Sequence, residues 1–170
     1  MSRPTPGTYA PYFERYIALT QGNHLYNLQR NHNLHITQFF SSIPNEKAEY
    51  AYAEGKWTVK EVIQHIIDTE RIFSYRLLRI ARHDNTPLPG FDENNFTVNA
   101  HAHHRSLGSL IEEFFAVRKA TDLLIDSIQP QALQLVGTAS EQPCSANALV
   151  FMIYGHILHH INIFKERYGL

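Results

Sequence analysis

The stretch around which this sequence is organised lies near the C-terminus and reads Tyr154-Gly155-His156-Ile157-Leu158-His159-His160-Ile161. His156 and His160 are four residues apart, a spacing that places two side chains on one face of an α-helix, one turn apart. Two imidazoles in this arrangement can bind one divalent metal ion. The best candidate for a third ligand is His65, which lies on another predicted helix.

The helix that carries this stretch is predicted to begin after Ser145, a favourable capping residue, and to run to about Arg167. Its inward stripe consists of Leu149, Met152, Ile153, His156, His160 and Ile163. In an ordinary helix all of these positions would be apolar. The two histidines therefore occupy places that a simple core would give to hydrophobic side chains.

The helix that carries His65 has the strongest start signal in the chain. Thr58-Val59-Lys60-Glu61 is a capping box, in which the first and last side chains each bond the other's backbone N–H. We expect this helix to run to Ala81. Its buried stripe is Val59, Val62, Ile63, Ile66, Phe73, Leu77 and Ile80, and His65 lies on the inward edge of that stripe.

The remaining apolar patterns complete an all-α fold. A short aromatic helix is predicted within 9–19, and two long helices within 23–43, capped by Asn23, and 106–128, capped by Ser106. The connections 45–56, 83–105 and 131–143 have no helical period, and no strand-like alternation occurs. Four amphipathic helices predict a four-helix bundle, a fold that places metal sites in its core. The connection 83–105 is long enough to let the helices on either side run parallel, and such long loops are often functional.

Composition favours one cytoplasmic domain spanning 1–170. The chain is 44% hydrophobic and 18% charged with a formal net charge of −1, so it has no bulk attraction to nucleic acid or to an anionic membrane. We find no apolar run of about 20 residues to span a bilayer and no signal peptide. One cysteine excludes an internal disulfide, and 11 histidines are the unusual count.

Two interpretations of the inward histidines compete. Each imidazole could be a core residue satisfied by hydrogen bonds. Three of them, His65, His156 and His160, would then leave several buried nitrogens to satisfy, whereas one divalent ion satisfies three at once. Three protein ligands also leave coordination positions open for water or a small-molecule substrate, as in catalytic metal sites. We favour the metal site.

Other candidates carry weaker signals. Asp68 lies about one turn after His65 and could orient its ring, although a solvated aspartate fits equally well. His159 lies about 60° around the helix from His156, which suits a position outside the ligand set. Cys144 lies at the start of the last helix, where the helix dipole would lower a thiol pKa. The loop histidines, which we expect to be solvated, are His101, His103 and His104.

Taken together, several motifs resemble the DinB-like, YfiT-like bacterial metalloproteins. They are Gly55-Lys56-Trp57-Thr58-Val59-Lys60-Glu61-Val62, His65-Ile66-Ile67-Asp68-Thr69-Glu70-Arg71, Pro87-Leu88-Pro89-Gly90-Phe91-Asp92, and Gly155-His156 with His159-His160. The resemblance implies a four-helix bundle whose second and third helices are parallel. It also implies a homodimer and a divalent metal, nickel or zinc with iron and manganese as alternatives, held at positions matching His65, His156 and His160.

The resemblance implies metal-dependent hydrolysis or thiol S-transfer with bacillithiol or mycothiol, and the nucleophile would be water or a thiolate. Members of the family often have glutamate where this chain has Ile157, so no general base can come from that position. The sequence is also not an H-E-x-x-H zinc-protease helix. A non-catalytic metal-binding or ligand-sensing bundle, and a bundle without metal, remain open as alternatives.

Overall fold

The computed structural model describes residues 2–170, so Met1 alone of the expected domain lies outside it. Helix α3 (Val59–Ala81) begins at the predicted capping box. The Thr58 hydroxyl accepts from the backbone N–H of Glu61 at 3.3 Å, and the Glu61 carboxylate accepts from the backbone N–H of Thr58 at 2.7 Å. These bonds satisfy amides that the first helical turn leaves without partners. Both predicted ends of this helix are confirmed.

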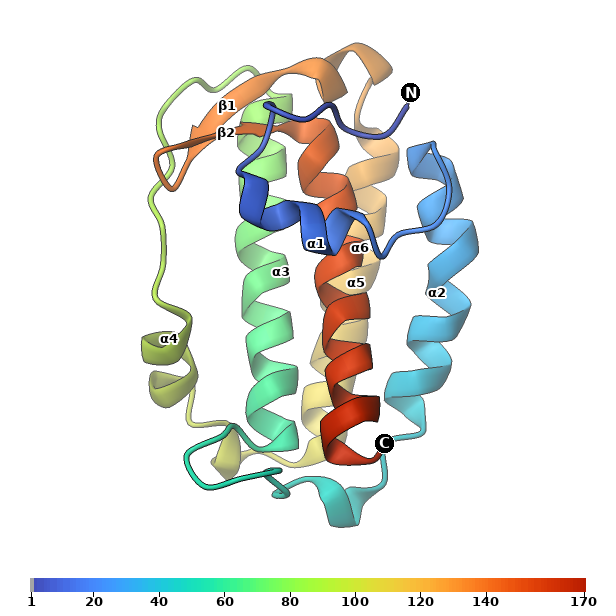
Figure 1. Cartoon of the computed structure of the whole chain (residues 1–170), viewed down its shortest axis with the longest axis vertical. Helices are drawn as coiled ribbons and strands as arrows, with labels where there is room; N and C mark the ends of the chain where they lie inside the picture. The colour runs from blue at the N-terminus through green and yellow to red at the C-terminus, as the bar shows by residue number, and fades with distance from the viewer. Residues whose placement is uncertain (1) are drawn as a thin grey trace.

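Four long helices form the bundle, and each begins at a capping side chain. They are α2 (Leu25–Ser41, capped by His24), α3, α5 (Leu107–Ser127, capped by Ser106) and α6 (Ala146–Ile163, capped by Ser145). Helices α3 and α5 run in one direction, and α2 and α6 run in the other (Figure 1). The predicted all-α four-helix bundle, with its second and third helices parallel, is confirmed. The cap of the first long helix is His24 and not Asn23.

Helix α6 is the central element, and nearly every side chain on it is buried. Helices α1, α2 and α3 pack around it, and it continues into a π-helical turn at Phe164–Tyr168. A helix that is apolar on all sides belongs inside a fold. The two histidines of the motif, His156 and His160, are therefore carried into the interior with it.

A short N-terminal segment crosses α6 and approaches it very closely. It consists of a 3₁₀ turn (Pro11–Phe13) followed by α1 (Glu14–Ile17). A Cβ added to Gly155 would lie 2.2 Å from the backbone carbonyl oxygen of Tyr16, which is too close for any other residue. The glycine beside His156 thus allows α1 to pack directly on the metal-motif helix. The expected short aromatic helix is present, and its Tyr16 packs inward.

The connection between α3 and α5 contains helical turns that the sequence analysis did not predict. Helix α4 (Glu93–Asn99) lies in it, followed by a 3₁₀ turn (Ala102–His104). The Asp92 carboxylate caps α4 by accepting from the backbone N–H groups of Asn94 and Asn95, at 2.9 and 3.1 Å. Seven residues are too few for a helical period to be visible in the sequence, so the expectation of an irregular loop was wrong here. A further 3₁₀ turn occupies Asn45–Lys47.

A β-hairpin precedes α6, where the sequence analysis predicted only a polar loop. A 3₁₀ turn (Pro130–Gln134) leads into strands β1 (Val136–Ala139) and β2 (Gln142–Ser145), which pair antiparallel. Each strand has four residues, too few for an alternating pattern to be recognised. Contacts distant in sequence hold the hairpin, because Leu88 exchanges backbone hydrogen bonds with Thr138 (2.9 Å) and Ser140 (3.0 Å).

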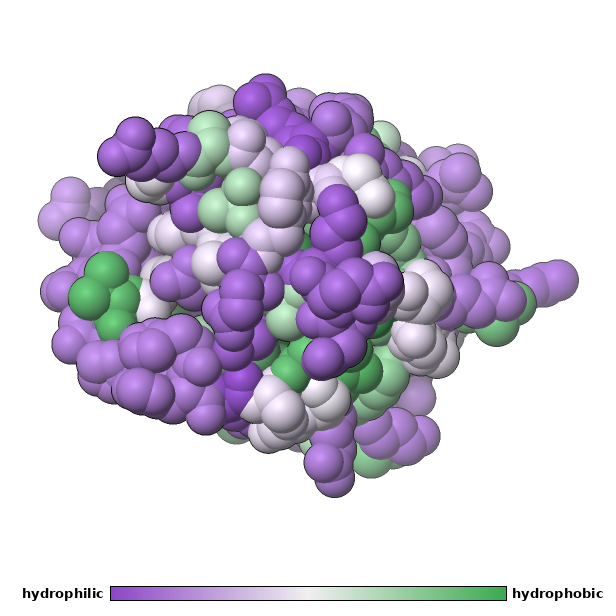
Figure 2. All heavy atoms as spheres, turned by 90° about the horizontal axis from the view of Figure 1, so that it is seen from below, coloured by the Kyte–Doolittle hydropathy of each residue, from purple (hydrophilic) through white to green (hydrophobic). Residues whose placement is uncertain are grey.

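The surface at the C-terminal end of α6 is mostly hydrophilic, and the hydrophobic residues visible there form small separate groups (Figure 2). Within residues 2–170, we find no helix that is both long enough and apolar enough to cross a membrane.

Candidate metal centre

Three buried histidines meet between α3 and α6. The Nε2 atom of His156 lies 3.1 Å from Nε2 of His65 and 3.1 Å from Nε2 of His160. The three side chains are the predicted ligands, and their candidate ligand atoms all lie within 4.8 Å of one another. Each residue is at most 7% exposed. The structure therefore brings the trio together, although ligation of a metal stays a prediction.

The backbone explains this convergence. His156 and His160 are one turn apart on α6, so their rings share one face of that helix. His65 lies on the side of α3 that packs against α6. All three ligand positions are thus on long, independently packed helices, which fix the side chains better than a loop would.

Burial keeps the three imidazoles neutral. Loss of solvent lowers the pKa of His65 to about 4. Burial, with nearby imidazoles as a smaller cause, holds the pKa values of His156 and His160 well below the ordinary value of 6.5. Neutral imidazole is the form that offers a lone pair to a metal. At neutral pH the cluster is ready to bind a cation without first losing protons.

The donor set fits a divalent metal better than a hydrogen-bonded core. A neutral imidazole has one N–H and one lone pair, so Nε2 of His156 cannot form good hydrogen bonds to both neighbouring Nε2 atoms. Nitrogens bound 2.0–2.1 Å from a tetrahedral zinc ion lie about 3.3 Å apart, close to the 3.1 Å that separates Nε2 of His156 from each of its two neighbours. The residues present therefore fit the metal that the family resemblance implies.

Aromatic side chains hold the imidazoles in place. The Trp57 ring lies 4.9 Å from that of His65, centroid to centroid, and the Tyr16 ring meets His156 edge-on at 5.5 Å. The hydroxyl of Tyr16 accepts from Arg15 Nη2 at 2.8 Å, which fixes the tyrosine in turn. This packing restricts ring rotation and keeps water away from those sides of the cluster.

Two cavities reach the cluster. One, of about 170 Å³, is bordered by His65 and His156 together with aromatic side chains and with Thr69, Arg76 and Glu93. The other, of about 260 Å³, borders His160 and is lined by residues that include Lys56, Trp57 and Asn94. Helix α4 supplies Glu93 to the first cavity and Asn94 to the second. The cluster is therefore accessible to small molecules, unlike a closed structural metal site.

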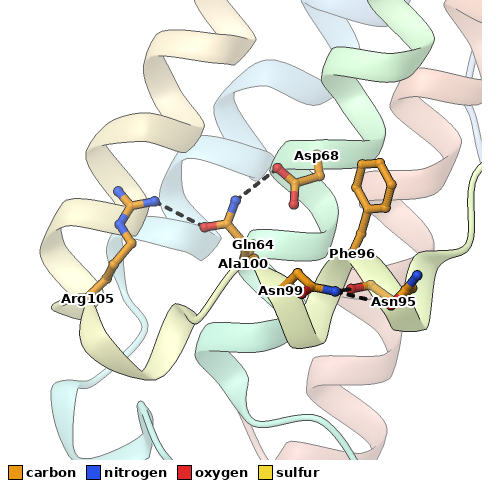
Figure 3. A pocket seen from close by; sticks show the side chains of 7 residues that line it. All are labelled: Gln64, Asp68, Asn95, Phe96, Asn99, Ala100 and Arg105. Atoms are coloured by element: carbon orange, nitrogen blue, oxygen red, sulfur yellow. Dashed lines mark hydrogen bonds between the residues drawn. The ribbon is translucent and has the colours of Figure 1, made fainter.

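Asp68 does not contact His65, in contrast to the role expected for it. Its carboxylate accepts from Gln64 Nε2 at 3.0 Å, and the Gln64 carbonyl accepts from Arg105 Nη1 at 3.1 Å. Gln64 and Asp68 point together into a third cavity of about 510 Å³ beside Phe96 and Asn99 of α4 (Figure 3). Being four residues apart, they share a helix face that is turned away from His65.

The remaining candidates lie outside the cluster. His159 is half-buried, with its ring 5.0 Å from that of Tyr16. The loop histidines His101, His103 and His104 are exposed, as expected. Cys144 lies on β2 rather than in a helix, and burial raises its thiol pKa to about 11. The expectation of a lowered thiol pKa was wrong, because desolvation and not a helix dipole dominates there.

Sequence reasoning missed the polar residues of the cavity beside His65 and His156. Arg76 is eleven residues after His65, about three turns along the same face of α3, so a charged residue on an inward stripe was an available signal. Glu93 lies in the connection 83–105, where no pattern singles out one side chain. Tyr16 reaches the site only because Gly155 lets α1 approach α6.

A comparison of the sequence with models of known protein families identifies the family of this chain. The sequence profile of the DinB superfamily matches residues 34–164, more than half of the chain and all three histidines. The chain belongs to the DinB superfamily. This agrees with the resemblance found from the motifs. Membership in the superfamily agrees with the observed fold. It does not specify a reaction, which has to be inferred from the site.

Two solved structures have folds similar to this DinB-superfamily chain. YfiT from Bacillus subtilis, described as a probable metal-dependent hydrolase with an unusual four-helix bundle topology, matches with a TM-score of 0.63 at 15% identity, over 98% of this chain and 93% of YfiT. A mycothiol-dependent maleylpyruvate isomerase matches with a TM-score of 0.67 at 14% identity, over 88% of this chain but 59% of the isomerase. At these identities the likeness concerns the fold alone.

Among curated proteins, a candidate metal-dependent hydrolase of Oceanobacillus iheyensis is 29% identical over 59 residues. The matched stretch covers 34% of each chain, so it spans about a third of that relative.

Proposed function

We propose that this DinB-superfamily protein binds one divalent metal ion, nickel or zinc, through His65, His156 and His160, and that it is a metal-dependent hydrolase. The observation that carries the proposal is the convergence of three buried, neutral imidazoles beside open cavities. A bound divalent ion would supply a Lewis acid and would lower the pKa of water or a thiol at the site. A closed, non-catalytic site would need a fourth protein ligand, and the cluster found within residues 2–170 has three.

The side chains around the cavity suggest how the chain would assist hydrolysis. The three histidines hold the centre, and Tyr16 and Phe73 cover the ring of His156. Ile157 is a buried apolar side chain and cannot accept a proton. Glu93 is the carboxylate that lines the cavity beside His65 and His156. We therefore assign Glu93 as the group that takes the proton from the attacking water.

Hydrolysis of a panel of simple esters and amides tests this proposal. The metal-loaded protein should hydrolyse at least one substrate, and chelation should abolish the activity. Because general acid–base catalysis contributes roughly 10²–10⁴-fold, Glu93→Gln should lower kcat by about 100-fold or more while the metal content stays unchanged. The matched control is Glu112→Gln, which alters an exposed glutamate on α5. Equal kcat values for Glu93→Gln and the control would remove Glu93 from the mechanism.

Thiol S-transfer is the second candidate, because cavities border the cluster on two sides and could hold a thiol and an electrophile separately. Rates of S-conjugation with added bacillithiol or mycothiol, compared with hydrolysis without thiol, separate the two reactions. Conjugation that exceeds hydrolysis for every electrophile tested would favour transfer.

A further inference from the structure

Among residues 2–170, Arg76 is a buried cation without a negatively charged partner. The residue is 4% exposed, and its Nη2 atom donates to the carbonyl oxygen of Pro89 at 2.7 Å and to the hydroxyl of Ser140 at 3.0 Å. Both acceptors are neutral. Within residues 2–170 no carboxylate lies within 4.0 Å of the guanidinium, whereas the other buried arginine, Arg118, is paired with Glu70.

An unpaired buried guanidinium is costly, because its desolvation is not repaid by an opposite charge. Arginine has five N–H donors, and the two bonds described above both use Nη2. The remaining donors belong to Nη1 and Nε, and Arg76 lines the cavity that His65 and His156 border. The position of this charge indicates that an anion from outside the chain enters that cavity.

The tip of the β-hairpin holds Arg76 in place. Ser140 and Glu141, at the tip of the hairpin, have φ values of 51° and 63°, in the left-handed region that favours glycine. Two-residue hairpin loops of type I′ require positive φ at both central residues, so these values follow from the pairing of Ala139 with Gln142. Backbone hydrogen bonds of Leu88 with Thr138 and Ser140 fix the tip, so the Ser140 hydroxyl is presented to Arg76.

We propose that Arg76 binds the carboxylate of a small organic acid, which is the substrate of the adjacent metal centre. The role as substrate rests on the function proposed above, while the binding of the carboxylate does not. A carboxylate oxygen can accept a charge-assisted hydrogen bond from one of the donors that remain on Nη1 and Nε. Phe73 and Phe91 line the same cavity and suit an apolar or aromatic body. Glu93, also in the cavity, disfavours multiply charged anions such as phosphate.

Calorimetric titration of the full chain with benzoate tests the carboxylate site, with benzamide as the uncharged isostere and inorganic phosphate as the other anion. Titrations are made with metal bound and again after chelation, which removes direct coordination of benzoate to the metal. Benzoate should bind in both states, and more tightly than benzamide or phosphate. Arg76→Gln should weaken benzoate binding at least about tenfold, as expected for hydrogen bonds to a charged group, without affecting benzamide. The control Arg82→Gln changes an exposed arginine just after α3 and should bind benzoate like the wild type.

Equal affinities of the wild type for benzoate and benzamide, or unchanged benzoate affinity in Arg76→Gln, would overturn the proposal. Tighter binding of phosphate than of benzoate would overturn the carboxylate assignment. Circular dichroism checks the fold of Arg76→Gln. If this variant does not fold, Arg76→Lys keeps the charge but loses the Nη1 and Nε donors, and should weaken benzoate several-fold while still preferring it to benzamide. Metal content is measured separately, so a wild type that binds benzoate but no metal would refute the proposed function and leave the carboxylate site standing.

Discussion

Two buried polar clusters inside the bundle differ in whether their charges and hydrogen-bonding groups find partners within the protein. In the first, Arg118 pairs with Glu70 at 2.7 Å and also with Asp122, whose carboxylate accepts from the Tyr154 hydroxyl at 2.7 Å. In the second, three imidazoles point their Nε2 atoms at one another, and Nε2 of His156 cannot form good hydrogen bonds to both neighbours. The first cluster supplies its own opposite charges, so its role can be purely structural. Among residues 2–170, the three facing Nε2 atoms have no common partner, and a bound cation would supply one.

Breaking the internally paired cluster should have the largest effect on stability. Arg118→Leu leaves Glu70 buried without its cation, and loss of one partner from a buried pair costs about 3–5 kcal/mol. Urea denaturation measures the difference in the free energy of unfolding. The matched control is Arg71→Leu, because the Arg71–Glu113 pair is largely solvent-exposed on the arginine side and should contribute less than about 1 kcal/mol. Similar losses in both variants would contradict the distinction between the clusters.

Removing the ligand from the histidine cluster should have the next largest effect. Metal at a free concentration of 100 times its Kd would stabilise the native state by about 2.7 kcal/mol, so chelation should lower the Tm by the corresponding amount. Helical content should remain, because the ligands lie on helices that pack through a large apolar core. Thermal denaturation followed by circular dichroism measures both quantities. Identical melting curves at a pH where binding is demonstrated would place the site outside the cooperative core.

The same cluster predicts a pH dependence of the chelated protein. The pKa of His65 is about 4 in the folded state, against about 6.5 when unfolded, so the unfolded chain binds more protons between these values. The free energy of unfolding is therefore highest above about pH 6.5, where the imidazole is neutral in both states. It falls as pH drops toward 4, because the unfolded chain gains a proton that the folded protein does not. Protons also compete with metal, so added metal should raise the Tm less at pH 5 than at pH 7.5. A gain in Tm that is the same at both pH values would contradict ligation by imidazole.

A smaller effect is expected at the glycine that lies between the two clusters in sequence. Gly155→Ala would force the Tyr16 carbonyl away from α6, and such overpacking costs about 1–3 kcal/mol. It should also loosen the cover of His156 and weaken metal binding. Gly108→Ala is the control, since its added Cβ meets nothing within 4 Å and should be neutral or slightly stabilising. Unfolding titrations that rank the two variants equally would show that α1 does not need this close approach.

The smallest effect concerns assembly. The family resemblance predicts a homodimer. Both clusters are complete within one chain, so dilution should change the mass measured by light scattering without changing the metal content per chain. A monomer mass at every concentration would remove the dimer prediction.

Much of the fold could be predicted because local signals and burial agree. Thr58, Ser106 and Ser145 cap three of the long helices as their sequences indicate, and the predicted stripes face the core. The hairpin and α4 escaped prediction because both are short and depend on distant contacts, such as those of Leu88. Such contacts cannot be predicted from the local sequence.

The site could be predicted only in part, because some of its residues follow from local spacing and others depend on tertiary packing. His65, His156 and His160 follow from helical spacing, which is a local property. Arg76 and Glu93 enter the site through packing of the hairpin and of α4, so their roles emerge only in three dimensions. Asp68 does not orient His65 because its carboxylate bonds to Gln64, a contact that helical spacing alone does not favour over one to His65.

Metal content of the protein purified without chelators tests the central claim most directly. Elemental analysis should find about one divalent ion per chain in the wild type and in His104→Ala, whose exposed loop histidine lies outside the cluster. His156→Ala and His160→Ala should each lose the ion, because each removes one of three ligands. Full metal content in both of these helix variants would contradict the assignment of His65, His156 and His160 as the metal site.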